Sequence, residues 1–178
     1  MLHTFISLVA LTQAATMTVA APETATDAFA ALEGNWQGQL EYRDYQSKAM
    51  QTIPVRVEFD TIPDDTTFLQ RSIFTDPAFP VLITTMINVT GETVSVANSR
   101  AGRAFETYAQ TVRLAKGATT VRWMMTLNRI DEDDNRPAAI REAIELDGDR
   151  LTVTKEVDFL DDERVEWMFR NRLTVRAQ

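Results

Sequence analysis

Apolar and polar residues alternate along most of this chain. The alternation is clearest in the segments 36–42, 53–59, 121–127, 151–159 and 165–175, where apolar side chains recur at every second position. The segments 66–75, 81–90, 92–98, 103–114 and 138–146 follow a weaker form of the same pattern. A period of two residues is typical of strands with one buried face, so the pattern predicts about ten strands.

Short connectors join these segments. Turn residues gather at 90–92, 116–118, 147–149 and 161–163, and no connector is long enough to hold a crossover helix. An antiparallel sheet of that many strands must close or stack, because an open sheet leaves its edges and its apolar face in water. Short turns favour closure over a sandwich. We therefore expect an all-β fold, an antiparallel up-and-down meander barrel of about eight to ten strands.

The first residues of the chain have the features of a secretory signal peptide. Residues 5–11 form an apolar run, and small residues follow it up to Ala21. We expect 1–21 to be the signal peptide, 22–178 to be the barrel domain, and the protein to be periplasmic or secreted. The alternative is a disordered or membrane-resting N-terminal segment. No other stretch approaches about 18 apolar residues, so no transmembrane span is expected.

Composition narrows the chemistry. The chain has 18 basic and 26 acidic residues and a formal net charge of −8, the wrong sign for a nucleic-acid partner. It has no cysteine, and its single histidine, His3, leaves with the predicted signal peptide. Thiol chemistry, a histidine metal cluster and a Ser-His-Asp triad are therefore not available to the mature chain. We expect no cofactor, no metal and no catalytic residue, and the motifs do not predict an enzyme.

A short helix and a three-residue motif precede the first strand. Thr26 to Leu32 predict the helix, with Asp27 as its N-cap, and Gly34-Asn35-Trp36 follows at the junction with the strand. This motif resembles the G-x-W signature of lipocalins and their calycin relatives. The resemblance implies that Trp36 closes one barrel end and that a basic residue of the last strand packs across it. The candidates are Arg170, Arg172 and Arg176, of which Arg172 is taken as the signature residue.

The chain also departs from that superfamily. The usual lipocalin disulfide is absent because there is no cysteine, and the haem-binding calycin branch uses a histidine that the mature chain lacks. The opening of the first strand, residues 36–45, is similar to uncharacterised bacterial lipocalin-like proteins. The resemblance therefore implies a barrel architecture and no specific activity.

A polar spot is predicted on one face of the segments 138–146 and 151–159. If residues 147–150 form the loop between them, Glu142 faces Lys155 among apolar pairs. Were this face to line the barrel, Glu142, Lys155 and Asn171 would orient a ligand among apolar walls. The alternative is an exposed face on which a Glu–Lys pair only fixes the register.

Further candidates follow from the same alternation. Tyr42, Trp123 and Trp167 share the predicted inward pattern and would wall a cavity, or else fill the core. Arg113 and Arg129 interrupt that pattern near strand ends, where each would meet a ligand carboxylate or lie in water. The acidic segment 131–135 resembles the start of a calcium loop, but Arg136 stands where the loop needs glycine, so we interpret it as a solvated hairpin.

Two functional hypotheses remain open. The first is an exported lipocalin-like barrel that binds or carries a small hydrophobic or amphiphilic ligand. The second is a ligand-free structural or protein-interaction module of the cell envelope, whose protein partner is unknown. A hollow barrel favours the first hypothesis and a filled barrel favours the second.

Overall fold

The structure is a computed structural model that describes residues 20–44, 47–75, 79–115, 117–161 and 163–178. The predicted signal peptide, 1–21, lies almost entirely outside the described residues. Within them the chain forms one helix and ten strands. These are α1 (Ala25–Ala30), β1 (Gly34–Arg43), β2 (Met50–Thr61), β3 (Thr67–Thr75), β4 (Pro80–Thr90), β5 (Thr93–Arg100), β6 (Glu106–Leu114), β7 (Arg122–Asp133), β8 (Arg136–Asp147), β9 (Arg150–Phe159) and β10 (Met168–Ala177).

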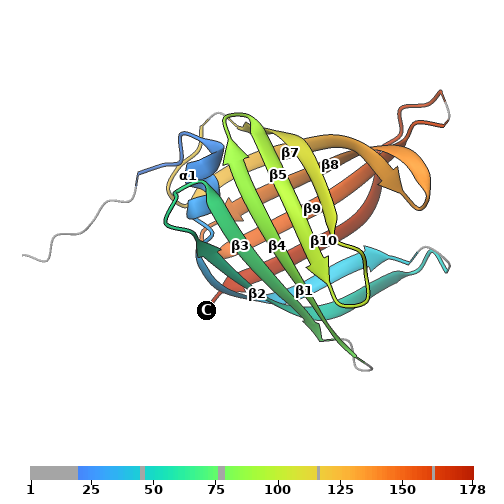
Figure 1. The fold of residues 1–178 in the computed structure, drawn as a ribbon, viewed down its shortest axis with the longest axis horizontal. Coiled ribbons are helices and arrows are strands. Elements are labelled where there is room, and N and C mark those ends of the chain that lie inside the picture. The colour runs from blue at the N-terminus through green and yellow to red at the C-terminus, as the bar shows by residue number, and fades with distance from the viewer. Residues whose placement is uncertain (1–19, 45–46, 76–78, 116, 162) are drawn as a thin grey trace, which may run out of the picture.

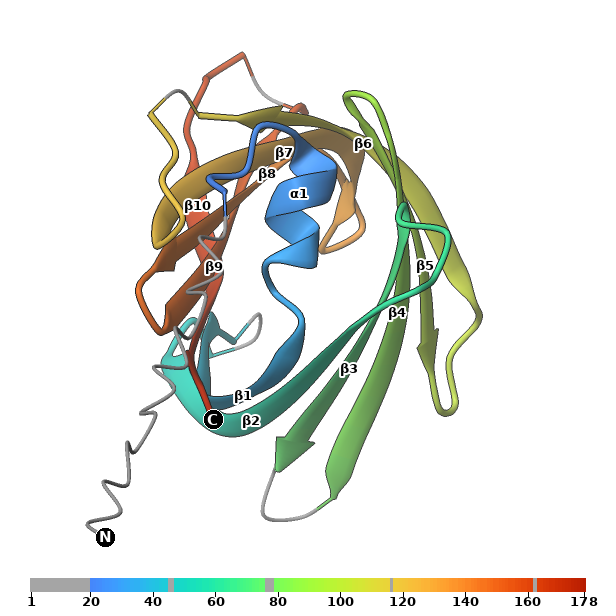
Figure 2. The ribbon, with the colours of Figure 1, turned by 90° about the vertical axis from the view of Figure 1, so that its left-hand side faces the viewer.

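The strands form a closed antiparallel barrel. Each strand pairs with its neighbours in sequence, and β1 also pairs with β10. Figure 1 shows the barrel from the side, and Figure 2 shows α1 inside the ring of strands at one end. The predicted all-β up-and-down barrel is confirmed. Closure gives every strand two partners, so no sheet edge is left unpaired.

The helix α1 begins at a capping box. The Thr24 hydroxyl accepts a hydrogen bond from the Asp27 backbone N–H at 3.1 Å, and the Asp27 carboxylate accepts one from the Thr24 N–H at 2.9 Å. Thr24 is therefore the N-cap, and the prediction of Asp27 in that role is wrong. Asp27 instead completes the box from the third helical position, because its side chain reaches back to the cap.

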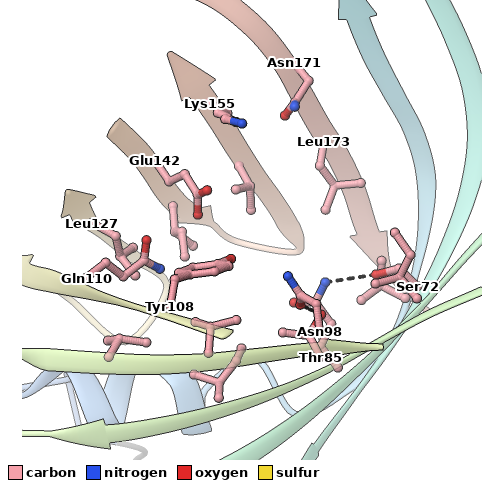
Figure 3. A pocket seen from close by; sticks show the side chains of 18 of the residues that line it. Ser72, Thr85, Asn98, Tyr108, Gln110, Leu127, Glu142, Lys155, Asn171 and Leu173 are labelled. Atoms are coloured by element: carbon pink, nitrogen blue, oxygen red, sulfur yellow. Dashed lines mark hydrogen bonds between the residues drawn. The ribbon is translucent and has the colours of Figure 1, made fainter. Parts of the chain in front are cut away.

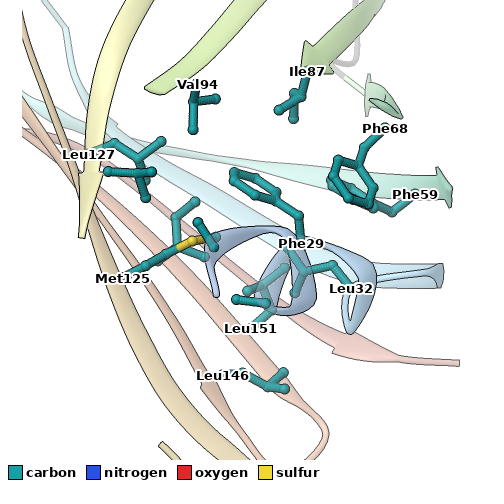
Figure 4. Close-up of a cluster of buried hydrophobic side chains, with 14 of the residues drawn as sticks. Phe29, Leu32, Phe59, Phe68, Ile87, Val94, Met125, Leu127, Leu146 and Leu151 are labelled. Atoms are coloured by element: carbon teal, nitrogen blue, oxygen red, sulfur yellow. The ribbon is translucent and has the colours of Figure 1, made fainter. Parts of the chain in front are cut away.

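The helix closes one end of the barrel. The Phe29 ring stacks on Phe59 and Phe68 with ring centroids 6.3 and 5.6 Å away. The Trp36 indole N–H donates to the carbonyl oxygen of Leu32 at 2.8 Å, which fixes the chain between α1 and β1. Figure 4 shows these aromatic and aliphatic side chains meeting around the helix. The apolar face of α1 therefore serves as a plug.

Burial changes along the barrel axis. Near α1, the inward side chains of Phe68, Val94 and Met125 are completely buried. Toward the opposite end, Val153 and Leu173 also face inward but are only half-buried. We call this second end, which the β1–β2, β3–β4, β5–β6, β7–β8 and β9–β10 connectors form, the open end. The main cavity opens toward the second end, where a smaller buried cluster of Ala138, Ile140, Val157 and Phe159 packs between β8 and β9 beside it.

A β-bulge shifts the alternation in the last strand. Phe169 pairs with Glu156, whereas Asn171 pairs with the next residue back, Lys155, so Arg170 is an extra residue in β10. A single inserted residue turns every side chain before it to the opposite face. For this reason Trp167, which comes just before β10, does not face the interior as predicted.

Candidate functional site

A cavity of about 770 Å³ occupies the hollow part of the barrel. It extends from Phe29 and Leu32 on the plug to Glu106 and Glu132, which are exposed at the open end. This volume lies within the range of small-molecule sites, roughly 300–1,000 Å³. The described structure is therefore that of a hollow barrel and not a filled one.

The part of the cavity nearest α1 is apolar. Its walls are inward side chains of several strands that surround the plug near α1. They include Trp36, Val57, Phe59, Ile87, Val94, Val96, Leu127, Ile144 and Leu151. A guest at this depth would meet hydrocarbon and aromatic rings, and its binding there would come from loss of apolar surface to water.

Polar side chains form a band between the apolar walls and the open end. On one side, the Gln70 side-chain amide donates to the Ser72 hydroxyl at 2.9 Å. The Thr85 hydroxyl donates to the side-chain oxygen Oδ1 of Asn98 at 2.8 Å. Figure 3 shows Ser72, Thr85 and Asn98, from β3 to β5, across the cavity from the second side. The second side consists of Tyr108, Gln110, Arg129, Glu142, Lys155 and Asn171.

Arg129 is the centre of the second side. Its Nη1 donates to Gln110 Oε1 and to Glu142 Oε1, both at 2.9 Å, and its guanidinium lies 4.1 Å from the centroid of the Tyr108 ring. The Arg129 side chain is 9% exposed, so this cation is held nearly out of water. Burial by itself would lower the pKa of Arg129, but Glu142 raises it above its ordinary value. Arg129 therefore stays charged.

The phenol of Tyr108 faces the same space. Burial raises the pKa of Tyr108, and the negative charge of Glu142 raises it further. Desolvation disfavours the phenolate, so Tyr108 keeps its proton at neutral pH. It thus offers an O–H donor to the cavity as well as an aromatic face.

A buried carboxylate anchors the band at the open end. Asp133 is 5% exposed, and its two oxygens accept from Lys155 Nζ and Arg170 Nε, each at 2.9 Å. Asp133 belongs to the acidic segment that we interpreted as a solvated hairpin. That interpretation is correct for the turn residues Asp134 and Asn135, which have positive φ as a two-residue hairpin requires. It is wrong for Asp133, which faces inward.

Four of the predicted site residues come together on the cavity wall: Arg129, Glu142, Lys155 and Asn171. The predicted register is observed, because Glu142 pairs with Lys155 across β8 and β9. The predicted ion pair between them is wrong, since Glu142 binds Arg129 and Lys155 binds Asp133. The strand β7 lies beside β8 and supplies a competing partner to each.

The structure places the other predicted residues elsewhere. Tyr42 lies at the open end in a neighbouring hollow. Trp123 is buried at the α1 end and does not line the main cavity. Trp167 is covered from outside by the Arg141 guanidinium, 4.1 Å from its ring, because the bulge reverses the alternation. Arg113 is exposed on β6 and does not line the cavity.

Arg172 does not reach Trp36. Trp36 pairs with Ala177 near the end of β10, whereas Arg172 pairs with Glu41. The Arg172 side chain is exposed and lies 5.4 Å from the Phe169 ring on the outer face. The expected contact is therefore corrected: even-numbered residues of β10 beyond the bulge point away from the interior, and Trp36 points into it.

Sequence reasoning missed much of the polar band. Tyr108 and Gln110 share the inward parity of Val112, and Asn98 shares that of Val96. The signal was present, because residues two apart on a strand face the same way. Asn98 follows the buried Val94 and Val96, whereas Tyr108 and Gln110 precede Val112, and in both strands the polar residues resemble a solvated extension of the apolar stretch.

The described residues contain no group of three or more histidine, cysteine, aspartate or glutamate residues arranged to hold a metal ion. Among the same residues, no helix combines the length and the apolar character needed to cross a membrane.

Comparison with known proteins gives a likeness of fold. No protein-family model and no curated protein matches the chain. The crystal structure of Rv2717c from M. tuberculosis is similar, with a TM-score of 0.62 and 14% identity over 86% of this chain and 97% of that one. A protein of unknown function from the DUF3598 family of Nostoc punctiforme covers 88% of this chain and 100% of that one, but with 8% identity and a TM-score of 0.28 it carries no argument. The first likeness supports the barrel fold.

Proposed function

We propose that this protein is an exported barrel that binds a small amphiphilic ligand, with the apolar part of the ligand toward α1 and its polar part toward the open end. The observation that carries the proposal is the cavity of about 770 Å³, which is apolar near the plug and polar above it. A guest with the same division would match both surfaces, whereas a wholly apolar guest would leave the polar band desolvated.

The apolar part of the ligand would gain its binding energy from the deep cavity. Val153 and Leu173 face inward yet remain half-buried, so an inserted chain would cover them. Burial of apolar surface stabilises a complex by about 25 cal/mol per Å² before the costs of association are subtracted. The plug residues Phe29 and Leu32 would form the end of the site.

The polar part of the ligand would meet preformed hydrogen-bonding groups. Arg129 and Glu142 are held by each other, which leaves their arrangement fixed before any ligand arrives. The Tyr108 hydroxyl and the Asn171 amide line the same space. A few fixed polar groups among apolar walls are typical of sites that orient a ligand.

Binding is tested by native mass spectrometry of residues 22–178 purified from the source envelope without detergent. We expect an added mass of a few hundred daltons that disappears on denaturation. The fluorescent amphiphile N-phenyl-1-naphthylamine gives a second readout. Trp36 lines the cavity while Trp123 and Trp167 do not, so a variant that keeps only Trp36 should transfer its emission to the bound probe.

A filling substitution makes the test specific. Val153→Trp places a large ring in the cavity and should weaken probe binding by about tenfold or more, because the guest and the ring need the same volume. Thr152→Trp is the matched control, since residue 152 points to the outer face of β9. Equal binding by both folded variants, confirmed by circular dichroism, would contradict a site inside the barrel.

The alternative, a protein-interaction module of the envelope, is favoured by one observation. Phe79, Phe105 and Val165 are 78%, 65% and 83% exposed, and all three lie in connectors at the open end. A partner that spans the open end would cover all three side chains at once, and exposed apolar surface that a partner covers is typical of interaction sites. Three results together would support this module instead. The mass spectrum would show no adduct, the probe would not bind, and a protein partner would be captured by the unchanged chain but not by Phe79→Ser.

Export is part of the same proposal and rests on the N-terminal sequence. An intact mass that corresponds to a chain starting after Ala20 or Ala21, recovered from the periplasm or medium, is the expected result. A full-length chain that starts at Met1 in the cytoplasm would contradict it.

A further inference from the structure

A second hollow of about 400 Å³ adjoins the main cavity at the open end. The two share Leu40, Phe74, Ile83 and Asn171 in their walls. The second hollow is therefore continuous with the amphiphile site proposed above, and a ligand in one would reach the other.

Three arginines distinguish this second hollow. Its lining contains Arg43, Arg100 and Arg170, from β1, β5 and β10, and no acidic residue. The remaining lining residues are apolar apart from Tyr42 and Asn171. Three cations on one small surface are unexpected in a chain whose formal net charge is −8. We call this set the arginine mouth.

Each arginine is placed by the fold. Arg100 pairs with the inward-facing Ile83 and so turns toward the barrel axis. Arg170 is the extra residue of the β10 bulge, and its Nε is held 2.9 Å from Asp133. Arg43 follows Tyr42, which pairs with Asn171, so Arg43 and Arg170 are neighbours on the paired strands β1 and β10. Burial lowers the pKa of Arg170, and the positive charge of Arg43 lowers it further.

Nearby carboxylates do not neutralise the arginine mouth. Asp133 accepts from both Arg170 and Lys155, and it does not line the second hollow beside Arg43 and Arg100. Glu106 borders a smaller hollow with Arg100 but forms no ion pair with it within 4.0 Å. Among the described residues, neither Arg43 nor Arg100 forms an ion pair. The mouth therefore carries an excess of positive charge.

We propose that the arginine mouth binds the anionic head group of the amphiphile whose apolar chain occupies the main cavity. The inference rests on the proposed function and narrows its ligand class to anionic amphiphiles. Guanidinium groups present paired N–H donors that match carboxylate and phosphate oxygens. An anionic head group there would offset the repulsion between Arg43 and Arg170. The apolar chain of the same amphiphile would then extend past Phe74 and Ile83 into the main cavity.

The test compares ligands that differ only in the head group. Dodecanoate, dodecyl phosphate and dodecan-1-ol displace N-phenyl-1-naphthylamine from the full mature chain below their micelle concentrations. We expect at least one anion to bind about tenfold more tightly than the alcohol, and its advantage to shrink as salt is raised. The two anions separate a carboxylate ligand from a phosphate ligand.

Charge-removing variants locate the effect. Arg43→Gln and Arg100→Gln should each weaken binding of the preferred anion about fivefold and leave dodecan-1-ol unchanged, because only the anion contacts the guanidinium groups. Arg113→Gln removes the same charge from the outer face of β6 and should change neither affinity.

The outcomes are distinguishable. Equal affinity for the alcohol and both anions, or an equal loss in Arg113→Gln and Arg100→Gln, would overturn the arginine mouth and leave the amphiphile site intact. Failure of all three compounds to displace the probe, or of the probe to bind, would overturn the proposed function itself.

Discussion

The two ends of the barrel are built from the same strands but differ in packing. At the α1 end, Phe29 stacks on Phe59 and Phe68, and all three rings are nearly inaccessible to solvent. At the open end, inward residues such as Phe74 and Leu173 border empty space. The first end supplies the tight packing on which stability depends, and the second leaves room for a guest. The larger buried cluster and the main cavity thus lie toward opposite ends of the barrel, although a second, smaller cluster around Ile140 and Val157 packs at the open end.

The contrast originates within single strands. On β5 the inward positions run from Val94 and Val96 near the plug to Asn98 and Arg100 at the open end. On β8 they run from Leu146 and Ile144 to Glu142, so apolar residues give way to polar ones at constant parity. Within the part of β5 and β8 that lines the cavity, one strand therefore supplies both apolar and polar wall; beyond Glu142, β8 returns to the buried apolar residues Ile140 and Ala138.

The largest expected effect is loss of the plug. Phe29→Ala should lower the free energy of unfolding by about 3–5 kcal/mol, because it removes a buried ring and leaves a void that its neighbours cannot fill. Chemical denaturation monitored by circular dichroism measures the change.

Tyr42→Ala provides the comparison at the open end. Tyr42 borders a hollow and is only half-buried, so its removal should cost about 1 kcal/mol or less. Equal costs at Phe29 and Tyr42 would mean that the two ends contribute equally, and the contrast drawn above would not hold.

A smaller loss is expected at the seam that joins β1 to β10. A Cβ on Gly38 would lie 2.0 Å from the Thr174 carbonyl oxygen and 2.8 Å from the Val175 Cα. Both are backbone atoms, so the strands themselves must separate. Gly38→Ala should cost about 3 kcal/mol. A control, Gly91→Ala, strains a turn with φ of 59° but meets no atom within 4 Å, and should cost less.

The next prediction concerns the buried carboxylate of the open end. Asp133→Asn leaves Lys155 and Arg170 without their shared negative partner and should cost about 2 kcal/mol. Asp131→Asn is the matched control, because Asp131 is exposed and its contact with Arg129 is a long one, 3.4 Å between Arg129 Nε and Asp131 Oδ2. Thermal unfolding of both variants at neutral pH tests this. If Asp133→Asn unfolds at the same temperature as the unchanged protein, the ion pairs of Asp133 do not stabilise the open end.

The fold follows from the sequence because alternation and turns act locally. The period-two pattern and the short connectors predict strands whose neighbours in sequence also pair in space. The antiparallel pairing of β8 with β9 follows from the turn at 147–149 alone. The plug was partly predictable: the short helix was expected, but its cap was assigned three residues too late.

The site was harder to predict because it depends on distant strands. Glu142 and Lys155 face each other, but Glu142 forms its ion pair with Arg129 and Lys155 forms its ion pair with Asp133. This pairing can be predicted only when β7, β8 and β9 are considered together. The bulge at Arg170 reverses the parity of Trp167, and no turn residue marks it. The arginine mouth joins β1, β5 and β10, which lie far apart in sequence and meet only when the barrel closes.

The smallest expected effect is the response to acid. The hydrogen bond from the Thr24 hydroxyl holds the pKa of Asp27 below its ordinary value of 3.8. A lowered pKa in the folded state means that Asp27 stabilises the protein fully above about pH 4 and that this contribution is lost as the pH falls through the folded-state pKa. Asp27→Ala should therefore cost about 1 kcal/mol or less near pH 6, and progressively less as the pH falls below about 4.

The open end offers a control with the same direction of shift. Arg136 lowers the pKa of Asp161 through a hydrogen bond, but both side chains are over 40% exposed. Water and salt screen such a pair, so Asp161→Ala should leave stability unchanged as the pH falls. Denaturation midpoints of the two variants across this pH range separate them. A pH-dependent loss at Asp161 equal to that at Asp27 would contradict the view that acid weakens the barrel first at its plug.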